Sequence, residues 1–170
     1  MLAGWLTCGV LWLAWQTAPA HAYEDQLSLG AGAGYAHLVS DASASHGVLG
    51  SVEASLGLDD IWAARASVSL GYYPAQSSRS LLLGSLELLY LVDVLEWVPY
   101  FGGGLDGIVL LDGAGHAGDL GVHPVIGLDW LVSRELLFGV ALRPVFVVSA
   151  LDRAPFYFTC TLSAAWLLDM

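Results

Sequence analysis

Lysine is absent from this 170-residue chain, and arginine supplies all five of its Lys+Arg residues. Sixteen aspartate and glutamate residues give the chain a formal net charge of −11. A nucleic-acid-binding surface needs clustered positive charge, and so does adhesion to anionic lipid through a polybasic segment. The composition therefore excludes both of these function classes.

Charged residues of either sign are also scarce, at 12% of the chain, where a typical soluble domain has about 25%. Hydrophobic residues make up 56%, and the mean hydropathy is +0.66. Yet beyond residue 22 no uncharged apolar run reaches the roughly 18 residues that a membrane-spanning helix needs. The chain therefore fits neither an ordinary soluble domain nor a helical membrane protein.

The first segment, residues 1–22, is uncharged and rich in leucine and tryptophan. It ends in Ala20-His21-Ala22, which has the small-residue pattern of a signal-peptide cleavage site. We therefore predict an export signal over residues 1–22 and a mature chain over residues 23–170. Cleavage removes Cys8 and leaves Cys160 as the single cysteine, so the mature chain has no intramolecular disulfide.

The mature chain shows a period-two alternation of apolar residues with small or polar ones. In residues 61–73 the even positions, from Trp62 to Tyr72, are apolar, whereas the odd positions carry mostly small and polar residues around Arg65. Strands of a transmembrane barrel have this pattern, because one face meets lipid and the other meets the lumen. The same alternation predicts eight strands, over residues 26–37, 48–58, 61–73, 80–91, 98–111, 119–132, 136–148 and 156–168.

A sheet that spans a membrane must close on itself, because lipid cannot satisfy the hydrogen bonds of an open edge. The predicted fold is therefore all-β: an eight-stranded, antiparallel, up-and-down transmembrane β-barrel after a cleaved signal peptide. An even number of strands returns both termini to the periplasmic side. The short turns at 59–60, 93–96 and 133–135 belong on that side, and the segments 40–45, 75–78, 112–118 and 149–153 form the outward loops.

Seven ionisable residues have the parity of the lumen face: Glu53, Arg65, Glu87, Asp106, His123, Asp129 and Arg143. Buried charges must be paired, and the interior of an eight-stranded barrel is just filled by side chains. We therefore predict a structural network of salt bridges that plugs the lumen. Arg65 lies at a similar depth to Glu53 and Glu87 on the neighbouring strands, so we expect it to pair with both carboxylates.

Aromatic residues mark one end of the predicted barrel. Trp62, Trp97, Trp130 and Trp166 all fall near the expected periplasmic ends of their strands, which predicts an aromatic belt at the membrane interface. Cys160 has the parity of the lipid face and is interpreted as a small apolar filler.

Candidates for chemistry are few. His37, His46 and His116 lie toward the outer side, where they are either solvated loop residues or a surface metal site, although their spacing is not a metal motif. The glycine-rich segment 30–34 lacks the helix that a dinucleotide-binding loop requires. No catalytic dyad is apparent, so we predict that the protein is not an enzyme and has no cofactor.

Two segments resemble a known family. Residues 98–105, with the sequence VPYFGGGL, look like the Pro-Tyr-x-Gly-x-Gly strand opening of the small outer-membrane β-barrels of the OmpA/OmpX type. Residues 127–130 (GLDW), followed by 133–135 (SRE), look like the penultimate hairpin of those proteins. The pattern covers nearly all of the mature chain.

This resemblance implies the outer membrane of a Gram-negative bacterium, with both termini in the periplasm. It implies contact with outer-membrane lipid and lipopolysaccharide, insertion by the barrel assembly machinery, and a structural or surface-interacting role without nucleic acid. Three alternatives stay open at this point: an outer-membrane enzyme that modifies lipid A, a narrow channel, and a soluble periplasmic barrel that binds a ligand.

Overall fold

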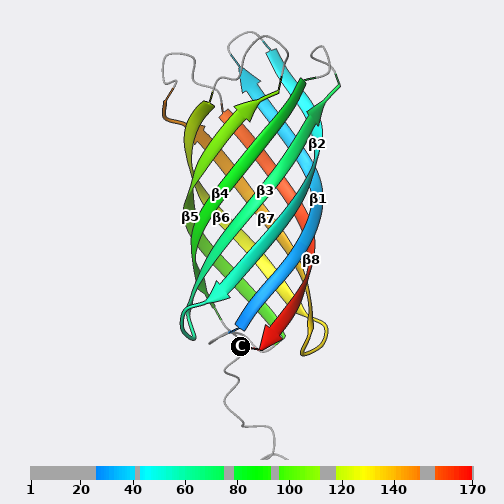
Figure 1. Cartoon of the computed structure of the whole chain (residues 1–170), viewed down its shortest axis with the longest axis vertical. Helices are drawn as coiled ribbons and strands as arrows, with labels where there is room; N and C mark the ends of the chain where they lie inside the picture. Colours follow the sequence, from blue (N-terminus) through cyan, green and yellow to red (C-terminus); the bar gives the residue numbers. More distant parts are fainter. Residues whose placement is uncertain are drawn as a thin grey trace, which may run out of the picture.

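A computed structural model describes residues 26–40, 43–74, 79–92, 96–111, 118–149 and 156–169. The predicted signal segment, residues 1–22, lies outside them. Eight strands make up the fold (Figure 1): β1 (Gln26–Ser40), β2 (Ser43–Gly57), β3 (Trp62–Tyr73), β4 (Arg79–Leu91), β5 (Trp97–Leu110), β6 (Gly118–Leu131), β7 (Leu136–Val147) and β8 (Phe156–Asp169). The described part of the chain contains no helix that could span a membrane.

Each strand pairs antiparallel with the next, and the first strand closes the sheet against the last. The closing seam runs from the pair Gln26–Asp169 to the pair Val39–Phe156. In Figure 1 the start of β1 and the end of β8 lie side by side at the lower end of the barrel. The predicted fold, an eight-stranded up-and-down barrel, is confirmed.

The two ends of the barrel differ. One end carries the start of β1, the end of β8 and the turns at 58–61 and 132–135, and we call it the terminal end. The end of β4 and the start of β5 also lie there, but residues 93–95 of the turn expected between them lie outside the described residues. The opposite end, which we call the loop end, carries the four remaining connections. Of the expected outward loops, residues 75–78, 112–117 and 150–153 lie outside the described residues.

The first outward loop was predicted over residues 40–45, and this predicted extent is wrong. The strands β1 and β2 continue to the pair Ser40–Ser43, and Ser45 lies buried inside the barrel. Small residues such as Ala44 carry little of the apolar signal by which the sequence marks a strand, although their backbones pair as well as any other. The strand alternation therefore extends further toward the loop end than hydropathy indicated.

Side-chain hydrogen bonds shape two of the turns at the terminal end. The Oδ1 of Asp59 accepts hydrogen bonds from the backbone N–H groups of Ile61 (2.8 Å) and Trp62 (2.7 Å). The Oγ of Ser133 accepts from those of Glu135 (3.3 Å) and Leu136 (3.1 Å). Asp and Ser favour tight turns because their short side chains can bond to the backbone two or three residues on. These hydrogen bonds hold the two turns that directly precede β3 and β7.

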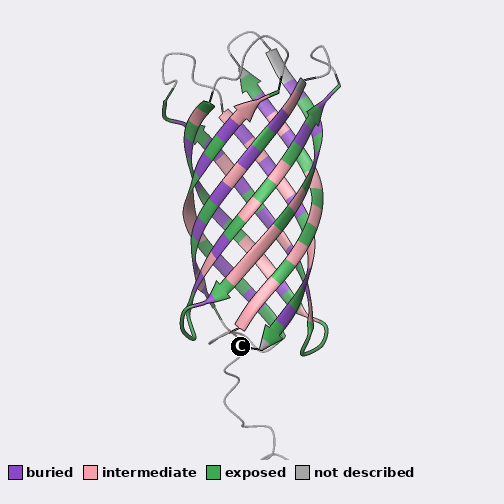
Figure 2. Cartoon of the chain, in the orientation of Figure 1, coloured by how far each residue is buried: buried purple, intermediate pink, exposed green. Residues whose placement is uncertain are grey.

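The outer surface is apolar over its whole circumference. Large hydrophobic side chains stand exposed on every strand, among them Val52, Leu86, Leu105, Ile126 and Leu162, which are 60 to 66% exposed. Figure 2 shows buried and more exposed positions alternating along the strands. An apolar exterior around a closed sheet is typical of a barrel that spans a membrane.

Packed side chains fill the interior in two apolar clusters. The cluster toward the loop end includes Leu38, Tyr73, Ile108, Val147 and Tyr157. The cluster toward the terminal end includes Leu89, Leu91, Val98, Tyr100 and Val125. A layer of charged and polar residues lies between them.

The parity of β3 can be tested by cysteine labelling. Val68 and Leu70 are about half exposed on the outside, whereas Ser67 and Ser69 face the lumen. In a Cys160→Ala background, a cysteine at position 68 or 70 is expected to react with a lipid-soluble maleimide and poorly with a water-soluble one. Equal labelling of all four positions by the water-soluble reagent in lipid vesicles would contradict a membrane-facing exterior.

Candidate functional site

The polar layer inside the barrel is the main concentration of ionisable groups. The seven residues predicted for the lumen all point inward, and six of them are buried: Arg65, Glu87, Asp106, His123, Asp129 and Arg143. The seventh, Glu53, is partly buried, and its side chain is 11% exposed. Alternation places these groups inside because each has the parity opposite to the lipid-facing residues of its strand.

Glu87 on β4 is the centre of the larger part of this layer. Its Oε1 accepts a hydrogen bond from the Nε of Arg143 on β7 at 2.6 Å, and its Oε2 lies 3.5 Å from an Arg143 terminal nitrogen. The Nε2 of His123 on β6 lies 3.2 Å from the same Oε1. Arg143 also donates to the Oγ1 of Thr161 on β8 at 2.9 Å and lies 4.0 Å from Glu53 on β2. One carboxylate and one guanidinium thus join five strands across the lumen.

His123 lies between two carboxylates. Its Nδ1 is 2.6 Å from the Oδ2 of Asp106 on β5, and the Oδ1 of Asp106 accepts a hydrogen bond from Ser85 at 2.5 Å. A catalytic triad needs the imidazole between the hydroxyl and the carboxylate, so that it can take the proton of the nucleophile. Here Asp106 occupies the middle position, and the side chains of His123 and Asp106 are fully buried. The arrangement holds the side chains in place and is not that of a nucleophilic site.

Arg65 has different partners from those expected. Its guanidinium lies 3.4 Å from the Oδ2 of Asp129 on β6, donates to the hydroxyl of Tyr100 at 3.0 Å and lies 4.8 Å from the centre of that ring. Its Cα is opposite that of Glu87, as the sequence suggested, but Glu87 pairs with Arg143 instead. The predicted pairing of Arg65 with Glu53 and Glu87 is therefore wrong, because long side chains in a narrow lumen reach the opposite wall.

Glycine makes room for these side chains. A Cβ at Gly127 on β6 would overlap the ring and hydroxyl of Tyr100 and would lie 2.6 Å from the carbonyl oxygen of Val140. A Cβ at Gly104 on β5 would lie 2.6 Å from the Cε1 of His123. The large interior side chains therefore fit because the strands beside them present glycine.

Two members of the polar layer, Ser85 and Thr161, were not singled out from the sequence, and Tyr100 was expected to fill the lumen but not to join the charge network. Their parity places them inside the barrel, and that signal was available. The partners that each one finds on distant strands depend on the three-dimensional closure.

Little free space remains in the lumen. A small cavity of about 10 Å³ lies beside Glu53, Arg143 and Thr161. That is room for about one water molecule. The interior formed by the described residues is therefore packed like a protein core.

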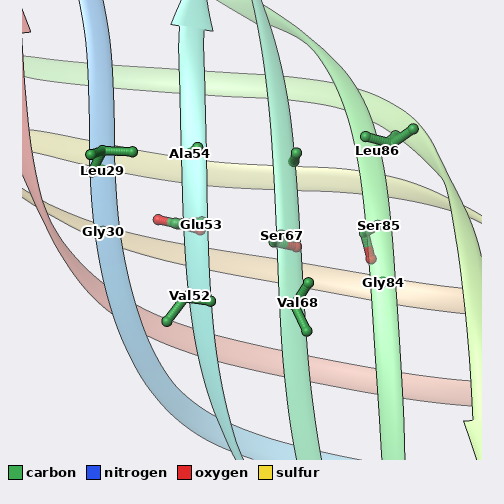
Figure 3. A pocket seen from close by; sticks show the side chains of 11 residues that line it. Leu29, Gly30, Val52, Glu53, Ala54, Ser67, Val68, Gly84, Ser85 and Leu86 are labelled. Atoms are coloured by element: carbon green, nitrogen blue, oxygen red, sulfur yellow. The ribbon is translucent and has the colours of Figure 1, made fainter.

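A larger hollow lies on the outer surface, over β1 to β4 (Figure 3), and has a volume of about 590 Å³. Its small residues are Ala54, Ala66 and Gly84, and larger side chains such as Leu29 and Leu86 surround them. No atom lies within 4 Å of the position that a Cβ at Gly84 would take. The hollow is a recess in the apolar exterior and faces the same surroundings as the rest of that surface.

The four predicted belt tryptophans are all exposed near the terminal end: Trp62, Trp97, Trp130 and Trp166. The indole rings of Trp97 and Trp130 are stacked, with their centres 5.3 Å apart and their planes 7° from parallel.

Of the three histidines considered for a metal, the structure brings His37 and His46 together on the outside of the barrel, and His116 lies outside the described residues. Among the residues that the structure describes, no group of three or more His, Cys, Asp or Glu side chains could hold a metal ion.

Comparison with known proteins identifies the fold. No protein-family model matches the chain, and no curated protein matches it in sequence. The crystal structure of Neisserial surface protein A matches with a TM-score of 0.65 at 15% identity, over 82% of this chain and 96% of the other. The outer membrane protein OprG from Pseudomonas aeruginosa matches at 0.59 and 11% identity, over 88% and 99%. Ail, the attachment invasion locus protein of Yersinia pestis, matches at 0.60 and 10% identity, over 85% and 99%.

These likenesses show that the chain has the fold of the small eight-stranded outer-membrane β-barrels, as the sequence pattern indicated. A second structure of Ail, which matches with a TM-score of 0.51, contains the heparin analogue sucrose octasulfate.

Proposed function

We propose that this protein is an integral β-barrel of the outer membrane of a Gram-negative bacterium, with a structural or surface-interacting role and a closed lumen. The observation that carries the proposal is the reversal of polarity between its two faces. Hydrocarbon-like side chains cover the outside, whereas buried charges occupy the inside. A barrel with this distribution of polarity stays dispersed only where its exterior is in lipid, because in water the exposed apolar surface would drive aggregation.

The closed lumen argues against transport and ligand storage. In the described part of the barrel, two apolar clusters and a paired polar layer fill the interior, and the cavity beside Glu53 has room for about one water molecule. A soluble ligand-binding barrel would need a polar exterior, and this exterior is apolar. The alternative of a lipid A-modifying enzyme has no support in the described residues. The hydroxyl of Ser85 is bonded to Asp106 and not to His123, so no imidazole is placed to take its proton.

In this proposal the terminal end faces the periplasm and the loop end faces outward. The exposed tryptophans at the terminal end mark one membrane interface. Lipid and lipopolysaccharide are the partners of the apolar belt, and the barrel assembly machinery inserts the chain.

Cell fractionation together with gel mobility tests the location. The protein is expected in the outer-membrane fraction, to remain there in alkaline carbonate, and to migrate differently before and after boiling, because a closed barrel resists detergent until it is heated. Release by carbonate, or a single mobility in both samples, would contradict the proposal.

Planar-bilayer recording tests the closed lumen separately. The folded protein is expected to give only sporadic small events, because Tyr73, Leu83, Leu89 and Tyr100 fill the lumen around the paired charges. A large porin reconstituted in the same lipid is the positive control for an open pore. Stable steps of porin size from this protein would show that the lumen opens in the membrane.

A further inference from the structure

Two histidines form a cross-strand pair on the outside of the barrel, close to its loop end. His37 on β1 lies directly opposite His46 on β2 in the strand register. Their ring centres are 4.7 Å apart, and the ring planes are 29° from parallel. Both share the outward parity of the exposed residues Tyr35, Val39 and Val48. The pair therefore lies at the rim of the barrel, beside the short connection between the first two strands.

Tyr35 completes the cluster from within β1. Its hydroxyl is hydrogen-bonded to the Nδ1 of His46, and its ring stacks with that of His37 at a centre-to-centre distance of 6.3 Å. This contact fixes the orientation of the His46 ring and leaves the Nε2 of His46 as its metal-binding nitrogen. Metal-binding histidines usually have their second ring nitrogen held in this way by a neighbouring polar group.

The Nδ1 of His37 has no such partner. It is buried and makes no hydrogen bond. Buried polar nitrogens are nearly always bonded, so an unsatisfied one indicates a position for an unseen partner. In the neutral tautomer that carries its proton on Nε2, this Nδ1 presents a lone pair, which is what a transition metal requires.

We propose that His37 and His46 form a two-histidine chelate for a divalent transition-metal ion, Cu²⁺ or Zn²⁺, with Tyr35 as the positioning residue for His46. Imidazole nitrogens suit both ions, and Cu²⁺ binds nitrogen and oxygen ligands most tightly in the first-row series. Water fills the remaining coordination positions, because no third His, Cys, Asp or Glu is grouped with the pair among the described residues. The site is therefore open and weaker than a closed structural site, and bound metal joins β1 to β2 through its ligands.

Binding of Cu²⁺ to the folded barrel in detergent micelles, purified without a histidine tag, tests the proposal. We expect an electron paramagnetic resonance spectrum with two coordinated nitrogens. His37→Gln and His46→Gln are each expected to lose one nitrogen and to bind about 100-fold more weakly. Tyr35→Phe is expected to keep both nitrogens and to bind about tenfold more weakly, at the lower end of the range for loss of an outer-shell partner.

Two variants serve as controls. His116→Gln removes a histidine that the sequence predicts on the outer side, and Cys160→Ser removes the free thiol next to Tyr35 in the register of β1 and β8. Both are expected to bind like the parent. Parent-like affinity in either His37→Gln or His46→Gln, or loss of binding in either control, would overturn the assignment.

A second measurement does not depend on any variant. Zn²⁺ is expected to raise the urea midpoint of the parent, because it binds the folded barrel and not the separated strands. The heat-dependent gel mobility of each variant shows whether it has folded. An unchanged urea midpoint at a Zn²⁺ concentration that saturates binding would count against a chelate that joins the two strands.

Discussion

Arg143→Leu is expected to lower the free energy of unfolding by about 3–5 kcal/mol, which is the usual cost of removing one partner of a buried ion pair. Arg143 donates to both oxygens of Glu87 and to Thr161, and it is the cation within 4.0 Å of Glu53. The side chain of Glu87 is fully buried. Leucine would leave Glu87 with His123 as its remaining partner and would leave Glu53 without its cation.

Urea unfolding in lipid vesicles measures this loss. Arg134→Leu is the matched control, because Arg134 lies exposed in a turn at the terminal end and the same atoms are changed. A change of no more than about 0.5 kcal/mol is expected there, as for most surface substitutions. If Arg143→Leu were as stable as Arg134→Leu, the polar layer would not contribute to holding the barrel together.

The double variant Arg143→Leu/Glu87→Leu distinguishes the energy of the ion pair itself from the cost of leaving the Glu87 carboxylate buried without its cation. Replacing both partners of a buried ion pair by apolar residues is often neutral or stabilising, so the double variant is expected to recover much of the loss. The difference between the double variant and the sum of the single variants gives the coupling energy of the pair. Purely additive losses would show that the contact between the two side chains is not the origin of the effect.

Gly34→Ala is expected to have the second large effect, at about 3 kcal/mol, the upper end of the usual cost of overpacking. Gly34 lies on the lumen side of β1, where β1 closes the barrel against β8. A Cβ there would overlap the carbonyl oxygen of Cys160 and would lie 2.9 Å from the Cα of Thr161. These are backbone atoms, which cannot move aside as a flexible side chain could, so the seam itself would have to open.

The matched control is Gly50→Ala on β2. Gly50 faces outward, and no atom lies within 4 Å of the position that its Cβ would take. Alanine there is expected to be as stable as the parent or slightly more so, because glycine in a strand interior has an entropic cost. The fraction of protein that refolds into detergent micelles and keeps its heat-dependent gel mobility measures both variants. Equal refolding of the two would show that the seam has more room than the structure indicates.

Much of the barrel follows from local chemistry. The alternation at Val68 and Ser69 assigns one face to lipid and one to the lumen, because side chains of a strand point in turn to opposite sides. Closure follows from the lack of hydrogen-bond partners in lipid. The strand count, the antiparallel order and the inward placement of Arg65, Glu87, His123 and Arg143 all derive from these two facts.

The extent of the first hairpin did not follow, because Ala44 and Ser45 carry little hydropathy signal while their backbones pair fully. The partners of the charges did not follow either. Neighbouring strands suggested Arg65 with Glu87, whereas the structure pairs Arg65 with Asp129 and Glu87 with Arg143. The sequence gives the face and depth of each group, and that information is local to its strand.

The pairing of His37 with His46 shows the same division. Both histidines could be placed toward the outer side from the sequence, but only the register of β1 against β2 sets them opposite each other. The sequence by itself determined the fold class and which side chains face lipid or lumen, because each depends on a strand and its immediate neighbours. The tertiary structure decided which charge meets which across the lumen, because that choice depends on the width of the closed barrel, on the strand register and on where glycine lets a large side chain pass.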